Sequence, residues 1–315
     1  MEQTLMAIGF LLAAYSVVGN DVIQTLGTFL SSNSKQKWWV LWLFAGSILT
    51  VVLVYGWLNY NGDVSYARLS KVNLPVPFHW WYVLPPLVLM VITRFGVPVS
   101  TTFLILSVFS SSTVIGKMIT KSVIGYLLAF AVAIVIYFII ARFVEKWFID
   151  NKMNTGKKYW TVLQWLSTGF LWSQWLIQDL ANIYVFLPRP LPVEYLVASL
   201  AAILGLLAYI FYNRGGSIQK IITTKTNTAD IRSATIVDFI YGFILLFFKQ
   251  MSNIPMSTTW VFVGLLAGRE FALTFRLAHR ESKGMYIMVL KDLGKVLLGL
   301  VVSTILVVLI KQLES

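Results

Sequence analysis

Two carboxylates lie in the interior of long apolar stretches of this chain. Asp21 falls within an almost uncharged run over residues 3–34, and Asp179 falls within a second such run over residues 159–187. A carboxylate at bilayer depth costs roughly 2.5–3.5 kcal/mol even on the more permissive insertion scale. A residue retained at that cost is a candidate for function, so we predict that both acids belong to a working site.

A cluster of hydroxyl side chains is repeated at almost the same spacing as the acids. The motif Pro98-Val99-Ser100-Thr101-Thr102 recurs 157 residues later as Pro255-Met256-Ser257-Thr258-Thr259, while the two acids are 158 residues apart. Two different polar clusters that share one offset indicate an internal duplication. We assign residues 1–150 to a first membrane repeat and residues 151–315 to a second, the two forming one integrated domain.

The residue types in these clusters suit ligands of opposite charge. Proline fits the first turn of a helix, so a helix that begins at a Ser-Thr-Thr motif would present backbone N–H groups and hydroxyls to an anion without any fixed positive charge. The pairs Asn20-Asp21 and Gln178-Asp179 offer hard oxygens for Na⁺, or a titratable carboxylate for H⁺. We predict broken or re-entrant helices at both kinds of motif, because irregular backbone at membrane depth must line a cavity or be buried in protein.

The composition places this chain among helical membrane proteins. Of its 315 residues, 58% are hydrophobic and only 12% are charged, with a mean hydropathy of +0.76, whereas about a quarter of the residues of a soluble domain are charged. The absence of cysteine excludes disulfides and thiolate metal sites. We attribute the net charge of +12 to cytoplasmic loops and not to nucleic-acid binding. The sequence contains no recognisable nucleophile–base pair and no phosphate-binding loop, so we do not expect an enzyme.

Each half divides into about five apolar segments. They are predicted at residues 3–31, 39–58, 81–95, 98–115 and 122–142, and again at 159–187, 193–212, 236–250, 254–268 and 286–310. If every segment crosses the bilayer, sixteen basic residues fall on one side and seven, Arg68 among them, on the other. The positive-inside rule then places both termini outside the cytoplasm of a multi-pass inner or plasma membrane protein, with the two halves inverted.

Other polar residues have structural interpretations at this stage. Asp238 lies near a predicted helix start, so we interpret it as a helix cap. Arg94 and Lys249 shortly precede the Ser-Thr-Thr segments, and we interpret them as cations whose side chains extend to the membrane interface. The Ser-Thr-Thr runs themselves have a packing alternative, in which each hydroxyl bonds to a carbonyl of its own helix.

The paired motifs resemble those of the inorganic phosphate transporter (PiT) family of sodium- or proton-coupled carriers. The resemblance rests on Gly19-Asn20-Asp21-Val22 with Gly27-Thr28, paired with Pro98-Val99-Ser100-Thr101-Thr102. Members of that family carry a Pro-(Val/Ile)-Ser-Thr-Thr motif in each of two inverted halves. It implies that Asn20, Asp21, Gln178 and Asp179 help to hold the coupling cation and the oxyanion, and that the six hydroxyls donate to the oxyanion. The chain departs from the family pattern at Gln24 and Gln178, where asparagine is usual, and at Phe103 and Trp260, where histidine is common.

These observations predict a secondary transporter that imports an inorganic oxyanion, which we expect to be phosphate, by symport with Na⁺ or H⁺. The expected partners are that anion and the lipid bilayer, and the sequence leaves a homodimer open. No cofactor other than the coupling ion is expected. The alternatives are a carrier or channel for another small anion such as sulfate on the same fold, and a membrane scaffold whose polar clusters serve helix packing.

Overall fold

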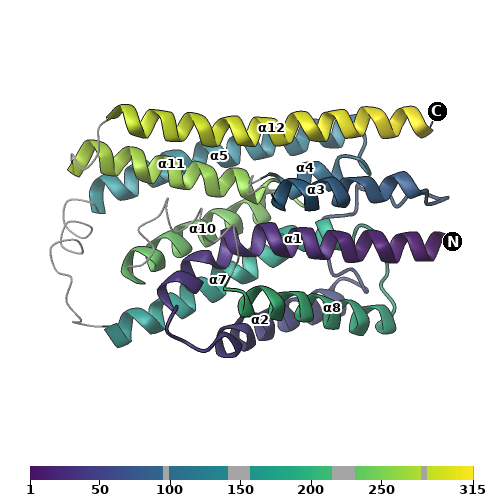
Figure 1. Ribbon diagram of the computed structural model, residues 1–315, viewed down its shortest axis with the longest axis horizontal. Helices are drawn as coiled ribbons and strands as arrows, with labels where there is room; N and C mark the ends of the chain where they lie inside the picture. The colour runs from purple at the N-terminus through teal and green to yellow at the C-terminus, as the bar shows by residue number, and fades with distance from the viewer. Residues whose placement is uncertain (95–98, 141–156, 215–230, 278–281, 315) are drawn as a thin grey trace.

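The computed structural model describes residues 1–94, 99–140, 157–214, 231–277 and 282–314, and these residues form helices and connecting loops with no strand. Figure 1 shows the elongated helical bundle. The elements are α1 (Glu2–Ser32), α2 (Trp38–Asn59), the short 3₁₀ helix η1 (Trp80–Val83), α3 (Leu84–Arg94), α4 (Thr101–Leu106), α5 (Ser112–Ile140), α7 (Lys157–Tyr184), α8 (Val193–Tyr212), α10 (Ile231–Met251), α11 (Thr258–Leu277) and α12 (Ser282–Glu314).

Six helices among the described residues are long and apolar enough to cross a bilayer. The stretches that meet this criterion of length and composition are Glu2–Val22, Trp38–Asn59, Ser112–Ile139, Val193–Tyr212, Ile231–Met251 and Val289–Glu314. A span needs about 20 residues, and α7 also reaches 28, although its composition is more polar. The prediction of a polytopic all-helical membrane protein is therefore confirmed.

The Ser-Thr-Thr segments do not cross the molecule, which agrees with the broken or re-entrant helices predicted at these motifs and departs from the topology count in which every segment crosses. Figure 1 shows α10 and α11 running inward and back out from one end, while α3 and α4 lie toward the other end. The predicted segment 98–115 is not one helix, because α4 ends at Leu106 and α5 begins at Ser112. With only six residues, α4 is about 9 Å long, far too short to span.

The Asn-Asp motifs lie within continuous helices, so the helix breaks predicted there are wrong. Asp21 falls inside α1, a helix of 31 residues, and Asp179 falls inside α7, a helix of 28 residues. The breaks that do occur precede the hydroxyl motifs, where Pro255 follows the end of α10. Proline stops a helix because it lacks the backbone N–H, whereas a single buried acid leaves the backbone hydrogen bonds intact.

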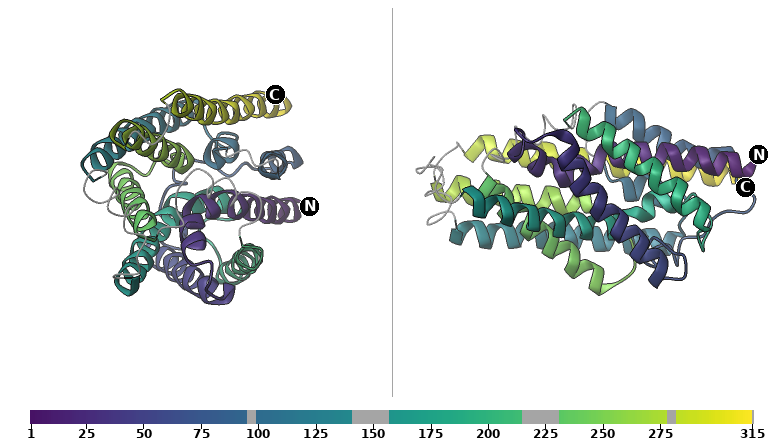
Figure 2. Two further views of the ribbon diagram at one scale, coloured as in Figure 1. Left: turned by 60° about the vertical axis from the view of Figure 1, so that its left-hand side comes forward. Right: turned by 90° about the horizontal axis from the view of Figure 1, so that it is seen from below.

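The contacts between helices are arranged in pairs, as an inverted duplication predicts. By order along the chain, α1 to α5 correspond to α7, α8, α10, α11 and α12. The α1–α3 contact then matches α7–α10, the α4–α12 contact matches α11–α5, and the α1–α8 contact matches α7–α2. The α1–α7 and α2–α8 contacts join corresponding helices. Both termini lie at the same end of the molecule (Figures 1 and 2).

Buried polar contacts hold α7 against α1 and α2. The Asn33 side-chain amide donates to Oε1 of Gln164 at 2.8 Å, and Nε1 of Trp172 donates to the carbonyl oxygen of Ala45 at 2.9 Å. Buried donors of this kind need partners of fixed geometry. They therefore set the position of α7 relative to α1, and so the relative position of the two duplicated acids.

Candidate functional site

The structure brings all ten predicted site residues into one buried region. They come from four helices and their leading residues: Asn20 and Asp21 from α1, Ser100, Thr101 and Thr102 from α4, Gln178 and Asp179 from α7, and Ser257, Thr258 and Thr259 from α11. None of them is more than 2% exposed. The two carboxyl groups are close enough for their charges to repel each other.

The first acid is held by donors from its own half. Oγ1 of Thr101 donates to Oδ2 of Asp21 at 2.7 Å, and Nδ2 of Asn20 donates to Oδ1 of the same carboxyl at 2.8 Å. That amide nitrogen also donates to the carbonyl oxygen of Val99 at 3.1 Å. The hydroxyl motif is thus tied to the acid motif of α1 through both a side chain and the backbone.

The second acid is held partly by the first half. Oγ1 of Thr102 lies 3.3 Å from Oδ1 of Asp179 and 3.2 Å from the carbonyl oxygen of Met256. Thr258, the counterpart of Thr101, lies close to the Asp179 carboxyl, although Oδ2 of Asp179 makes no hydrogen bond of normal geometry within the described residues. Neighbouring threonines of α4 therefore contact one acid from each half.

Asn182 joins these groups, and the sequence prediction missed it. Its Nδ2 lies 2.8 Å from Oδ1 of Asp179, 3.1 Å from Oγ1 of Thr101 and 3.2 Å from Oγ1 of Thr102. The signal was present, because Asn182 follows Asp179 by three residues, which places both on one face of a helix. It also occupies the position that Gln24 has in the first repeat.

The two serines of the hydroxyl motifs cap the helices that follow them. Oγ of Ser100 accepts from the backbone N–H of Phe103 at 3.2 Å, and Oγ of Ser257 accepts from the backbone N–H of Trp260 at 3.3 Å. This is the N-cap geometry that satisfies a free N–H of the first turn. Their hydroxyl protons can still donate, so the prediction that these serines contact an anion stays a prediction.

Several side-chain oxygens beside the acids make no hydrogen bond to any described residue. They are Oδ1 of Asn20, Oε1 of Gln178, Oδ2 of Asp179 and Oδ1 of Asn182, all buried. A buried acceptor without a donor costs about 1–3 kcal/mol. Oxygens of this type are ligands for hard cations. No group of three or more His, Cys, Asp or Glu side chains that could hold a metal ion occurs among the described residues.

Asp238 is a third buried acid and not the helix cap that the sequence suggested. It lies well inside α10, 1% exposed, and accepts hydrogen bonds from the hydroxyls of Thr28 at 2.7 Å and Thr168 at 2.5 Å. Those threonines belong to α1 and α7, so this carboxyl joins three helices drawn from both halves. The side chain of Arg94, interpreted above as an interfacial cation, lies outside the described part of the chain.

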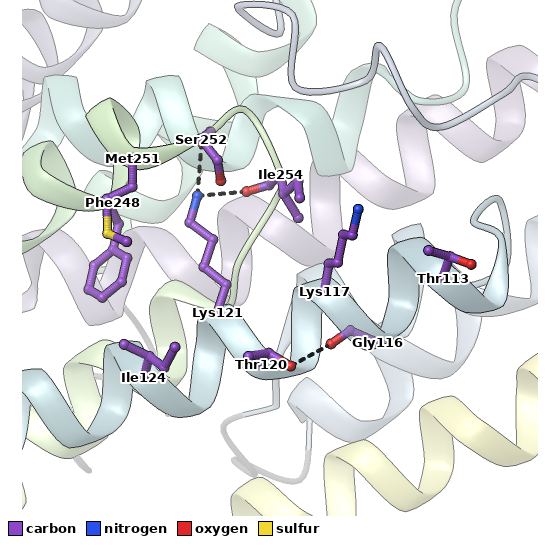
Figure 3. A pocket seen from close by; sticks show the side chains of 10 residues that line it. All are labelled: Thr113, Gly116, Lys117, Thr120, Lys121, Ile124, Phe248, Met251, Ser252 and Ile254. Atoms are coloured by element: carbon purple, nitrogen blue, oxygen red, sulfur yellow. Dashed lines mark hydrogen bonds between the residues drawn. The ribbon is translucent and has the colours of Figure 1, made fainter.

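Lys121 of α5 holds the loop that leads into the second hydroxyl motif. Its Nζ donates to the carbonyl oxygens of Ser252 and Ile254, at 2.9 and 2.8 Å. Figure 3 shows these bonds at the wall of a pocket of about 420 Å³. Lys117 also lines this pocket, and no hydrogen bond from its side chain to the other lining residues is drawn. The neighbouring Ser122 accepts from the backbone N–H of Ser257 at 2.9 Å. The pocket contains none of the predicted site residues.

The comparison with solved structures supports the same architecture. The chain is similar over 98% of its length to a structure described as "The sodium-dependent phosphate transporter", with 99% of that chain covered, a TM-score of 0.60 and 17% sequence identity. No protein-family model matches the sequence, and comparison with curated proteins gives no match. At this identity the likeness shows the fold alone, which this polytopic helical chain shares with that solved structure.

Proposed function

We propose that this protein is a secondary transporter that imports inorganic phosphate by symport with Na⁺. The observation that carries the proposal is the convergence of both duplicated acids with the hydroxyls of both halves, joined by Asn182. Inverted repeats with a midplane site are a recurring plan of secondary transporters. The name of the similar solved structure, a sodium-dependent phosphate transporter, agrees with this function.

The acids and their neighbouring amides would hold the coupling cation. Asp21 and Asp179 are buried and lie close enough to repel each other. Two ionised carboxylates in such surroundings are costly unless cations or protons compensate them. The unpaired oxygens of Asn20 and Gln178 complete a set of hard donors. Binding of Na⁺ there removes the repulsion and releases the threonine hydroxyls for an anion.

The threonines would then donate to the oxyanion. In the structure, Thr101 and Thr102 contact carboxyl groups and not each other, so their protons can be redirected when a cation neutralises those carboxyls. Phosphate suits this site better than sulfate because at neutral pH it keeps a proton that it can donate to a carboxylate. Sulfate offers only acceptors.

We propose that the protein lies in the inner or plasma membrane with both termini extracytoplasmic.

Equilibrium binding tests this proposal on the detergent-purified protein. Phosphate should raise the thermal unfolding temperature in Na⁺ buffer and should raise it much less when K⁺ replaces Na⁺. The reason is that binding of Na⁺ and binding of phosphate each increase the affinity for the other ligand. Thr101→Ala and Thr258→Ala should each weaken phosphate binding by about 1–3 kcal/mol, since a desolvated oxyanion loses a donor. Thr120→Ala is the matched control, because that exposed hydroxyl donates to the carbonyl oxygen of Gly116 in its own helix. Absence of any phosphate-dependent shift in either buffer would contradict the proposal.

A further inference from the structure

Arg68 is a buried cation in a loop, although the sequence placed it among the surface-loop cations. It lies between α2 and η1 and is only 2% exposed. A fully buried arginine is rare unless its charge is paired. Its surroundings therefore matter for the chemistry of the site.

The loop around Arg68 is built to hold its position. Oδ1 and Oδ2 of Asp63 accept from the backbone N–H groups of Ser65 and Ala67, at 2.8 and 3.0 Å. Tyr66 and Ala67 adopt left-handed backbone, with φ of 56° and 59°, a conformation that non-glycine residues rarely take. Strained backbone of this kind clusters at functional sites.

A residue of the second repeat also holds this loop in place by hydrogen bonds to its backbone. Nη1 of Arg189, in the segment between α7 and α8, donates to the carbonyl oxygens of Leu69 and Val72, at 2.7 and 2.9 Å. Two charge-assisted bonds across a sequence separation of this size fix the loop against the opposite half. Arg68 is thus presented inward by contacts from both halves.

The charge of Arg68 acts on the duplicated site. Burial lowers its pKa from 12.5 to about 10, while the charge of Asp179 acts in the opposite direction. Arg68 therefore remains cationic at neutral pH. It is also close enough to interact electrostatically with Lys121 and Lys249.

Two nitrogens of the Arg68 guanidinium nevertheless lack a hydrogen-bond partner among the described residues. Nε and Nη1 of Arg68 make no hydrogen bond to any described residue, and both atoms are buried. Interaction with Asp179 operates through charge, without a direct hydrogen bond from either nitrogen. A guanidinium presents its donors in a planar fork whose geometry matches two oxygens of a carboxylate or phosphate.

We propose that Arg68 binds the transported oxyanion, supplying from outside the duplication a fixed positive charge to the site of Asp179 and the threonines. The inference rests on the proposed function and deepens it by naming a residue that binds the oxyanion directly. The sequence predicted an anion site that needs no fixed charge, and Arg68 adds one. The competing role is that of a structural counter-ion for Asp179.

Uptake kinetics with matched variants separate the two roles. In proteoliposomes with an inward Na⁺ gradient, Arg68→Gln should raise the KM for phosphate by about 10- to 100-fold, the effect of losing a charge-assisted hydrogen bond. Half-saturation by Na⁺ should change much less. Arg68→Lys keeps the charge but loses the fork, so its KM should lie between the two. Lys71→Gln removes the same charge from an exposed position of the same loop and should leave the KM unchanged.

The outcomes distinguish failure of this inference from failure of the proposed function. Wild-type KM for phosphate in Arg68→Gln, or a change confined to Na⁺ activation, overturns the role of Arg68 while leaving symport in place. If Arg68→Gln does not fold, as judged by thermal unfolding and gel filtration, Arg68→Lys decides: a wild-type KM overturns the inference and a raised KM supports it. A wild-type protein that neither binds nor accumulates phosphate overturns both proposals.

Discussion

The polar residues of the site form one shared hydrogen-bond network and not two independent copies. Asn182 contacts Asp179 together with two threonines of the other half, and Thr102 bonds to both Asp179 and the Met256 backbone. The described donors to the acids are neutral hydroxyls and amides, which cannot offset two buried negative charges as a cation does. Ligand binding at one acid must therefore be felt at the other.

Removing the second acid's charge should abolish transport without unfolding the protein. Asp179→Asn keeps the shape of the side chain and its contacts with Asn182 and Thr102, but it removes the charge that would hold a cation. We expect Na⁺-driven phosphate uptake to fall to background, with membrane expression and gel-filtration profile unchanged. Glu194→Gln, which neutralises an exposed acid at the start of α8, is the control. Full-rate uptake by Asp179→Asn would rule out a coupling role for this carboxyl.

Duplication made the site residues predictable, and residues without that signal were missed. The matched offsets identified both acids and all six hydroxyls before any geometry was known, and the structure gathers them in one region. Arg68 does not belong to a duplicated motif, so the matched offsets did not identify it. Its burial depends on a loop whose inward fold is set by distant contacts with Arg189, and local sequence does not encode those contacts. Asp238 was misread for a related reason, since its threonine partners come from other helices.

At the scale of the helices, close packing of α5 against α11 holds the second hydroxyl motif in place. Gly264 and Gly268 of α11 are four residues apart and face the carbonyl oxygens of Tyr126 and Phe130 in α5. Spacing of this kind lets two membrane helices approach until their backbones touch. The first residue of α11 is Thr258, so the helix that carries the hydroxyls is positioned by this contact.

A methyl group added at this crossing should separate the two helices. In Gly264→Ala, the new Cβ would overlap the carbonyl oxygen of Tyr126, which is backbone and cannot rotate away. We expect a loss of about 1–3 kcal/mol, the usual cost of overpacking, seen as a lower thermal unfolding temperature and reduced uptake. Gly205→Ala is the control, since nothing lies within 4 Å of its added Cβ. Equal unfolding temperatures for the two variants would show that the crossing is not tight.

The helical class and the approximate element positions follow from composition and apolar runs, but the path of the chain did not. Hydropathy cannot distinguish a helix that crosses from one that turns back, because both bury apolar side chains. The count of basic residues therefore treated the α10 and α11 segments as crossing, whereas they form a hairpin whose turn lies beside α5, in agreement with the re-entrant helices predicted from the Ser-Thr-Thr motif. The sequence does show the helix break at Pro255, but it does not show how deep inside the molecule that break lies.

At the scale of the whole molecule, the proposed transport requires the site to open to either side, and the contacts between corresponding helices are where the two halves meet. Corresponding helices of the two halves meet at α1–α7 and α2–α8, and the acids lie on the first of these pairs. In inverted-repeat transporters, one repeat or bundle rocks against the other around a fixed midplane site. Contacts that join the halves directly, such as Thr102 with Asp179, are those that such a motion would rearrange.

Accumulation of radiolabelled phosphate in proteoliposomes tests the central claim most directly. Purified protein is reconstituted at fixed pH, with and without an inward Na⁺ gradient, and challenged with excess sulfate. We predict phosphate accumulation above equilibrium that requires the Na⁺ gradient and is not blocked by sulfate. Equilibration without accumulation would indicate a channel. No phosphate entry under either a Na⁺ or an H⁺ gradient would contradict phosphate symport on this fold.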